Sequence, residues 1–488
     1  MTFPNADIAF IVNPSLWYKK MYPGGILFLS NYLTTHGYHN TIIDSAISTQ
    51  KIPFYERKNK LLEYLEKYLP QIICFSSTHK EFSEVVAINN CLKITAKKSG
   101  KKIFTIVGGP QPTYRASDYL DHGFDFVCIG EGEKTLLAFV QEIDSKQYRW
   151  HKIDGIAWRG DGVVTRNPPR SLMSEQELNL LEFSAYKKIS QQHFDFNIET
   201  IRGIPLRTGM ILTTRGCPFS CTFCGCPSIF GHKLRFRPLQ SIEQELAFLQ
   251  EQFQIEGVWI IDDTFTMNRE HAFAVSDLLK KYNLLWGCQS RVDDRKEEFI
   301  QYFKKSGCVQ IDFGVESGSQ RILDQIIRKK IKVSDVKHTF TLTKKYKIRS
   351  LANFMIGLPT ETAKDLQATK ELAKAIQADV YVFSIAIPLP GTKLYEMVGE
   401  SISPLDYNAL DWNGSDLINK VNKSEISNLI EERQKLKRKY LLRSMIKSTF
   451  SLSMFSFLLF KNYRYKRIVA ICTFIFKNFL SAPRKSSP

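Results

Sequence analysis

The 488-residue sequence lacks an apolar run long enough to cross a lipid bilayer. A spanning helix needs about 20 apolar residues, and the longest uncharged apolar stretch near the end of the chain covers only 448–460. The first residues lack a basic segment followed by an apolar core and a cleavage site, so we expect no secretory signal and a cytoplasmic protein. With 26 Gly and 19 Pro, the chain is neither collagen-like nor of low complexity. Its hydrophobic content of 43% can fill the cores of about two or three domains.

Acidic residues are missing from the last part of the chain. The segment 433–488 contains 14 Lys or Arg and no Asp or Glu, so it holds most of the formal net charge of +18. Two apolar, aromatic stretches, 450–460 and 468–476, separate its basic clusters. This combination favours peripheral contact with a membrane surface, and the alternative is a pair of helices that pack on the rest of the chain with a solvated basic face. Nucleic acid is a less favoured partner, because no recognisable binding module accompanies the charge.

Short apolar, strand-like runs alternate with helical stretches in the first part of the chain. This alternation predicts an α/β fold with a doubly wound parallel sheet. Ligands bind to such sheets beyond the carboxyl ends of the strands, where the loops 76–79, 108–110 and 130–133 lie. We therefore expect a Rossmann-like ligand-binding domain over residues 1–145, followed by a connector with a β-hairpin over residues 146–204.

Strand and helix candidates alternate again from Met210 onward. Their spacing predicts a partial (βα) barrel of about six units over residues 205–400, with its chemistry on the loops that follow the strands. A helical, basic C-terminal region is expected over residues 401–488. The six strand candidates are 210–214, 257–261, 286–290, 309–315, 351–356 and 380–387.

Four of the ten cysteines lie within ten residues. Cys217, Cys221 and Cys224 follow the first barrel strand with the spacing Cys-x3-Cys-x2-Cys. In a long chain without secretory features, such a cluster indicates a metal or redox site rather than disulfides. Iron–sulfur clusters are usually held by four thiolates, so a three-cysteine loop leaves one iron able to accept an outside ligand. The alternative is a structural zinc site that uses Cys226 as a fourth thiolate, although zinc loops usually contribute two separate cysteine pairs.

This cysteine loop resembles the signature of the radical S-adenosylmethionine (SAM) superfamily. The stretches 107–113 and 130–135 are similar to loops of the subgroup that carries an N-terminal cobalamin-binding domain, and the similarity extends over residues 5–400. Further matching stretches are Ile261–Thr266, Gly314–Gly318, Gly357–Glu361 and Pro390–Thr392.

The resemblance implies a metal site with SAM as its outside ligand. Cys217, Cys221 and Cys224 would bind a 4Fe-4S cluster and serve as the catalytic and metal-binding residues, while SAM chelates the fourth iron. Phe223 would pack beside the adenine of SAM. Cys226 departs from the ligand spacing and is expected to be a bystander.

The resemblance also implies polar contacts to SAM from the ends of the barrel strands. Asp262 and Asp263 would accept hydrogen bonds from the SAM ammonium, and Glu316 would lie near the ribose. Arg291 would hold the SAM carboxylate through paired N–H donors. The alternative for each of these side chains is a surface ion pair or a cap at a strand end.

The predicted cobalamin-binding loops depart from a common pattern of the subgroup. Many of its members present a lower ligand on an Asp-x-His-x-x-Gly loop after the first strand, but the corresponding stretch 13–25 has no histidine. His79 is the candidate cobalt ligand, with a polar surface histidine as the alternative. Glycines in the loops would let the backbone approach the corrin closely, or would simply form tight turns. The remaining predicted cobalamin contacts are Thr78, Gly108, Gly109, Gly130 and Glu131.

The resemblance implies a cobalamin-dependent radical SAM enzyme. Reductive cleavage of SAM would give a 5'-deoxyadenosyl radical that abstracts hydrogen from an unactivated carbon, and a methyl group would then pass to a small-molecule or lipid substrate. Flavodoxin or ferredoxin would supply the electron. The alternatives are a non-methylating rearrangement or oxidative cyclisation, a methylthiotransferase, and a non-catalytic cobalamin or iron–sulfur sensor.

Overall fold

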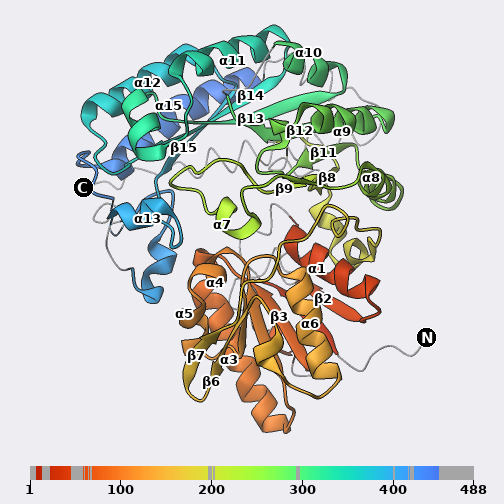
Figure 1. The fold of residues 1–488 in the computed structure, drawn as a ribbon. Coiled ribbons are helices and arrows are strands. Elements are labelled where there is room, and N and C mark those ends of the chain that lie inside the picture. The colour runs from red at the N-terminus through yellow and green to blue at the C-terminus, as the bar shows by residue number, and fades with distance from the viewer. Residues whose placement is uncertain are drawn as a thin grey trace. The chain divides into compact units, whose positions relative to one another are not determined.

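The computed structural model forms two compact units, each built from separate segments of the chain (Figure 1). The first unit comprises 1–193, 215–241 and 387–423, and the second comprises the remaining segments, 194–214, 242–386 and 424–488. The residues that the structure describes are 7–13, 22–44, 59, 61–63, 65, 69–195, 201, 204–292, 297–398, 402–415, 417 and 422–449.

The first unit contains a seven-stranded sheet with the order β2-β1-β3-β4-β5-β6-β7. Its first five strands are parallel, which confirms the doubly wound arrangement. Their order reverses between β1 and β3, and this reversal marks the ligand-binding edge of such sheets. The parallel strands are β1 (Ile8–Val12), β2 (Asn40–Asp44), β3 (Ile72–Ser76), β4 (Phe104–Gly108) and β5 (Phe126–Cys128).

Helices cover both faces of this sheet, because right-handed crossovers in opposite directions place them on opposite sides. Helices α1 and α6 pack together on one face (Figure 1). The described helices of this unit are α1 (Gly24–Thr35), α3 (Phe82–Ser99), α4 (Pro110–Tyr114), α5 (Ala116–Asp121), α6 (Glu133–Asp144), α7 (Cys226–Phe230) and α13 (Lys393–Val398). The short strands β9 (Thr214–Arg215) and β10 (Arg235–Phe236) form a separate ribbon.

The hairpin that we predicted in the connector extends the sheet. Strand β6 (Ile156–Gly160) pairs antiparallel with β5, and β7 (Val163–Arg166) pairs antiparallel with β6. Asp161 and Gly162 form the turn with φ angles of 49° and 81°, as expected of an Asp-Gly hairpin. The hairpin thus adds two antiparallel strands to the edge of the parallel sheet. The predicted domain boundaries stay predictions.

The second unit contains a six-stranded parallel sheet in the order β15-β14-β13-β12-β11-β8. Each strand neighbours the next along the chain, and β8 and β15 form the two edges, so the six predicted strands build a partial barrel. These strands are β8 (Thr208–Ile211), β11 (Gly257–Ile260), β12 (Leu285–Ser290), β13 (Cys308–Glu316), β14 (Arg349–Ile356) and β15 (Val380–Ile385).

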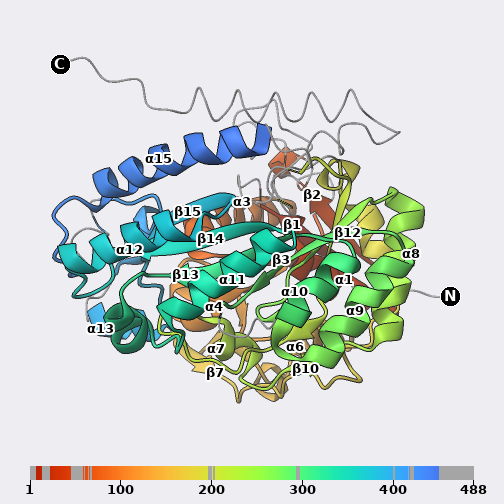
Figure 2. The same cartoon turned by 90° about the horizontal axis from the view of Figure 1, so that it is seen from above.

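Amphipathic helices cover the outer face of this sheet (Figure 2). Trp286 of β12 is fully buried there and packs edge-on against Phe303 with ring centroids 4.9 Å apart. In β13 (Cys308–Glu316), apolar side chains alternate with the polar Gln310, Asp312 and Glu316. The covering helices are α8 (Leu239–Phe253), α9 (Arg269–Lys281), α10 (Glu297–Lys305), α11 (Val333–Lys345) and α12 (Ala363–Ile376).

The C-terminal region contains helix α15 (Leu429–Thr449), which packs along β15 (Figure 2). Tyr440 is buried, and its ring lies 4.2 Å from that of Tyr381. This confirms the helical character expected of the region, whereas the two apolar stretches within 450–488 lie outside the described residues. In the part of the chain that the structure describes, every helix is too short or too polar to span a bilayer.

Candidate functional site

The cysteine loop runs from β9 to α7 in the first unit. The backbone N–H of Cys217 donates to the carbonyl of Gly231 (3.1 Å), and that of Cys224 donates to the carbonyl of Cys221 (3.1 Å). Cys217 is buried and the other two cysteines are half-buried. The described cysteines form no disulfide, so the loop offers three thiols on one short, anchored segment.

Backbone constraints fix the entrance of this loop. Gly216 has a φ of 97°, and a Cβ atom there would lie 2.2 Å from the carbonyl oxygen of Lys233. Both the left-handed φ and the close approach require glycine. The loop therefore turns sharply just before its first cysteine.

Contacts from elsewhere in the first unit hold the far side of the loop. The hydroxyl of Tyr114, on α4, donates to the carbonyl of Gly225 (2.7 Å), and burial raises the pKa of that tyrosine. The backbone N–H of Leu394 donates to the carbonyl of Thr222 (2.8 Å). Phe223 lies half-buried at this turn, and its contact with adenine stays a prediction.

The donor set of the loop fits an iron–sulfur cluster. A mononuclear ion needs its ligands gathered around one point, and the described residues include no such group of three or more His, Cys, Asp or Glu side chains. A cubane binds each thiolate through a different iron, so its ligands are spaced more widely. Three thiols on one short loop suit this second arrangement.

The carboxyl edge of the parallel sheet carries buried amide groups with unused hydrogen-bonding atoms. Asn13 follows β1, and its Nδ2 donates to the carbonyl of Ser76 (2.8 Å). The Oδ1 atom of Asn13 and the Nε2 atom of Gln111 are buried and have no hydrogen-bond partner among the described residues. Buried polar groups are normally paired. One acceptor and one donor at this edge fit the amide side chains at the rim of cobalamin.

Glycines bring two loops of this edge close together. The backbone N–H of Ser77 donates to the carbonyl of Gly108 (2.9 Å). Gly109 has a φ of 112°, and a Cβ atom there would lie 2.7 Å from the carbonyl oxygen of Ser77. Gly130 also has a positive φ of 75°, and its N–H donates to Thr113 Oγ1 (3.1 Å). These bonds establish the tight-turn role of the glycines, and their contacts with the corrin stay predictions.

His79 lies in a 3₁₀ turn after β3 and is buried. Its Nε2 atom donates to the carbonyl of Leu410 (3.0 Å), and burial lowers the pKa of the imidazole to about 4. The neutral ring would therefore have only Nδ1 for binding cobalt. Thr78 donates from N and Oγ1 to Glu81 Oε2 (2.9 and 3.1 Å). The predicted cofactor contacts of Thr78 and His79 remain untested by this geometry.

Glu131 lies in a buried network of charges. Its carboxylate accepts a bidentate pair of bonds from Arg235 (2.8 and 2.9 Å), one from Arg215 (3.3 Å) and one from the N–H of Met173 (2.8 Å). The other end of Arg215 donates to Glu133 (2.5 Å). A contact between the Glu131 carboxylate and cobalamin would compete with these bonds, and the predicted cobalamin contact of Glu131 stays a prediction.

The two arginines of this network are functional candidates that the sequence did not reveal. Burial opposes the ionisation of Glu133, but the neighbouring Arg215 guanidinium holds the pKa of that carboxyl below its ordinary value. The one sequence feature that points to the network is an arginine two positions before Cys217, in a chain that also carries an acidic Gly-Glu-Gly-Glu loop.

In the second unit, Asp262 follows β11 and is fully buried. Its carboxylate accepts hydrogen bonds from the N–H of Thr213 (2.6 Å), from the Thr213 hydroxyl and from the Thr214 hydroxyl (2.8 Å). Burial raises the pKa of Asp262 to about 6. The carboxylate thus fixes the segment that follows β8, and Asp263 beside it is exposed. Contact of either residue with SAM stays a prediction.

Arg291 and Glu316, predicted from separate strands, meet around Lys329. The carboxylate of Glu316 pairs with Lys329 Nζ (2.6 Å), which also donates to the carbonyl of Gly314 (2.8 Å). Arg291 donates to the carbonyl of Lys329. Glu316 therefore forms a buried ion pair, not the surface ion pair that was its alternative role, and Lys329 is a further member of the group that the sequence did not indicate. Contacts of this cluster with SAM stay predictions.

Two family domains match this chain. The Radical SAM superfamily domain covers residues 211–373, and the B12 binding domain covers residues 18–140. An uncharacterized methyltransferase of Pyrococcus horikoshii is 31% identical over 340 residues, which are 69% of this chain and 71% of that protein. Cytidylyl-2-hydroxyethylphosphonate methyltransferase of Streptomyces wedmorensis is 25% identical over 418 residues, which are 76% and 77% of the two chains.

A solved structure shares the fold. The radical SAM methyltransferase TsrM of Kitasatospora setae, with cobalamin and a [4Fe-4S] cluster bound, superposes with a TM-score of 0.66 at 19% sequence identity, covering 80% of this chain and 74% of that chain. The two matched domains imply SAM, a 4Fe-4S cluster and cobalamin as cofactors. Together with the relatives named as methyltransferases, they identify the chain as an enzyme. This chain belongs to the cobalamin-binding group of the radical SAM superfamily.

Proposed function

We propose that this enzyme transfers a methyl group to an unactivated carbon of a small-molecule or lipid substrate. The observation that carries the proposal is that the three-thiol loop and the cobalamin-type sheet edge belong to the same compact unit. Tyr114 connects them, since it lies on the helix after β4 and bonds to Gly225 beside the last cysteine. When bound, the cofactors supply reductive cleavage of SAM and the methyl group for transfer.

The protein contributes binding and orientation. Cys217, Cys221 and Cys224 would hold the cluster, on a loop whose backbone is hydrogen bonded on both sides. At the sheet edge, Asn13 and Gln111 would satisfy their buried amide atoms with the corrin amides. Each contact is made from a backbone already fixed by the fold, which lowers the cost of ordering the site.

Arg291, Glu316 and Lys329 would provide polar contacts to SAM. Arg291 and the ion pair of Glu316 with Lys329 are all less than 10% exposed. A guanidinium and an ammonium suit the carboxylate of SAM, and a carboxylate suits its ribose hydroxyls or ammonium. We propose that this cluster and Asp262 orient SAM for cleavage.

Replacement of Cys221 by Ala tests the cluster and the reaction together. After anaerobic reconstitution, Cys221→Ala should lose cluster iron and form no 5'-deoxyadenosine, whereas the control Cys226→Ala should keep both. SAM labelled in its methyl group should label the product. Full iron content and activity in Cys221→Ala would refute the cysteine assignment.

The same assay separates the alternative functions. Formation of 5'-deoxyadenosine without transfer of the labelled methyl group would identify a rearrangement or an oxidative cyclisation. Transfer of a methylthio group would identify a methylthiotransferase. Binding of cofactors without cleavage of SAM would identify a sensor. Reduced flavodoxin or ferredoxin should replace the chemical reductant.

We also propose peripheral contact with the cytoplasmic face of a membrane. Helix α15 exposes Lys437, Arg438 and Lys439 in a row, and such residues are attracted to anionic lipids. Replacement of all three by Gln should abolish flotation with anionic vesicles and should leave the buried face of α15 intact. Equal flotation of the variant and the parent protein would refute a contact made through these three residues.

A further inference from the structure

Four charged side chains are buried together in the first unit. Glu131 and Glu133 follow β5, Arg215 belongs to β9, and Arg235 belongs to β10. Their side chains are only 5–7% exposed. Two carboxylates face two guanidinium groups, so the cluster, which we call the charge clamp, is electrically balanced.

Stability alone does not account for the charge clamp. Taking charges out of water costs several kcal/mol per ion, and well-packed apolar residues often stabilise a protein as much as a buried ion pair does. Arg215 is further enclosed by aromatic rings, with its guanidinium carbon 5.5 Å from the ring centroid of Phe28 and 5.8 Å from that of Phe230. The four buried charges therefore indicate a role beyond stability: they fix a backbone segment, or they set the electrostatic field around it.

Residues of the charge clamp lie at both ends of the cysteine loop. Arg215 stands two residues before Cys217, across the constrained Gly216. Arg235 donates to the carbonyl of Phe230 (2.7 Å), the last residue of the helix that follows the loop. The carboxylates belong to the carboxyl end of β5, so the same bonds attach the loop to the cobalamin-type sheet.

We propose that the charge clamp positions the cysteine loop and sets the reduction potential of the cluster bound there. This inference rests on the proposed function, because it requires the cluster. Charges in a poorly solvated interior are weakly screened, and the potentials of iron–sulfur clusters respond to nearby net charge, hydrogen bonds and solvent exposure. The four side chains are positioning residues, since they act through the loop and through their field.

Opposite shifts are expected from removing opposite charges. Glu133→Gln leaves an excess positive charge beside the loop and should make the cluster easier to reduce. Arg215→Gln leaves an excess negative charge and should make it harder to reduce. The double variant Glu133→Gln/Arg215→Gln restores the balance and should return the potential close to that of the parent protein.

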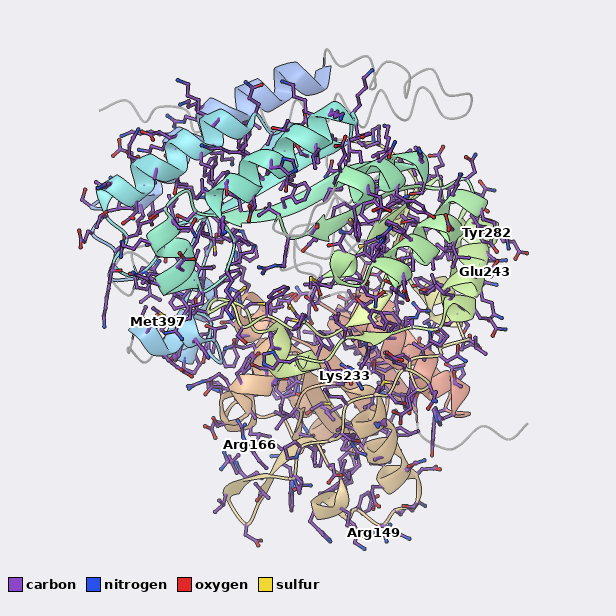
Figure 3. The ribbon with its side chains drawn as sticks, turned by 45° about the horizontal axis from the view of Figure 1, so that its top comes forward. Arg149, Arg166, Lys233, Glu243, Tyr282 and Met397 are labelled. Carbon is purple, nitrogen blue, oxygen red and sulfur yellow. The ribbon has the colours of Figure 1, made fainter. Side chains whose placement is uncertain are left out.

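The experiment is a redox titration of the full-length, anaerobically reconstituted protein, followed by electron paramagnetic resonance. Each single variant should change the reduction equilibrium about tenfold, which corresponds to about 59 mV for a one-electron couple. Matched controls are Glu142→Gln and Arg149→Gln, which remove an ion pair of 2.8 Å at the surface of the same unit. Arg149 is 44% exposed and is labelled at the surface in Figure 3, so both controls should titrate like the parent protein.

The outcomes separate this inference from the proposed function. A parent protein without a reducible cluster refutes the proposed function. A parent protein with a cluster, and single variants whose potentials are unchanged or move in the same direction, overturns the charge clamp. If a single variant fails to retain iron, the double variant decides: retention of the cluster at the parent potential supports charge balance, and loss of iron there as well refutes it.

Discussion

Asp262 should make the protein less stable as the pH rises from about 4 to 7. Its pKa is about 6 in the folded protein, against an ordinary value of 3.8. A raised carboxyl pKa means that the folded state binds the proton more tightly than the unfolded state does. The stabilisation is complete below the ordinary pKa and is lost as the pH passes through the folded pKa. A difference of about two pH units corresponds to about 3 kcal/mol.

Replacement of Asp262 by Asn isolates this effect. The amide keeps an acceptor for the N–H of Thr213 (2.6 Å), while its NH₂ group faces the threonine hydroxyls, which can rotate to accept. The variant cannot ionise. Between pH 4 and pH 7, the free energy of unfolding of Asp262→Asn should therefore rise by about 2 kcal/mol relative to that of the parent protein.

The assay is urea denaturation followed by circular dichroism at several pH values. Asp161→Asn is the control, because its side chain is exposed in the turn between β6 and β7, and its profile should run parallel to that of the parent protein. Parallel profiles for Asp262→Asn as well would refute the argument, since they would mean that Asp262 titrates alike in the folded and unfolded states.

Two further substitutions test backbone and packing. Gly216→Ala should lower the iron content of the cluster, because the added Cβ would lie 2.2 Å from the carbonyl oxygen of Lys233. The control Gly162→Ala also has a positive φ but open space around the Cβ. It should lower the free energy of unfolding by only about 1–2 kcal/mol and keep its iron. Tyr440→Ala should cost about 3–5 kcal/mol and speed hydrogen exchange in α15, whereas the exposed Gln434→Ala should not. Normal iron in Gly216→Ala, or unchanged exchange in Tyr440→Ala, would contradict these expectations.

The strands of both sheets could be predicted because their residues alternate with helices and are apolar over short runs. β1 reads Ile-Ala-Phe-Ile-Val and is wholly buried, which is typical of a parallel strand covered on both faces. The six barrel strands appear within a few residues of the expected ranges. The pattern of residues within each strand carries this information, so the strands can be predicted without knowing which distant segments pair.

Pairings between distant segments could not be predicted in the same way. The Asp-Gly turn indicated a hairpin, but whether it extends the sheet depends on pairing with β5. Similarly, Lys329 carries no motif of its own, and only folding brings its ammonium to Glu316. A charged residue looks solvent-exposed in a sequence until its partner is known.

The Gly-Glu-Gly-Glu loop shows how the same residues can support two interpretations. Its resemblance to a cobalamin loop led us to expect that Glu131 contacts the cofactor. In the structure Glu131 pairs with Arg235, 104 positions along the chain, and with Arg215, 84 positions along. A carboxylate with these bonds would have to give up charge-assisted hydrogen bonds worth about 1.5–3 kcal/mol each to reach a neutral corrin amide. The energetic balance therefore favours a structural role for the carboxylates of this loop, because their bonds to Arg215 and Arg235 attach the cysteine loop to the segment that follows β5.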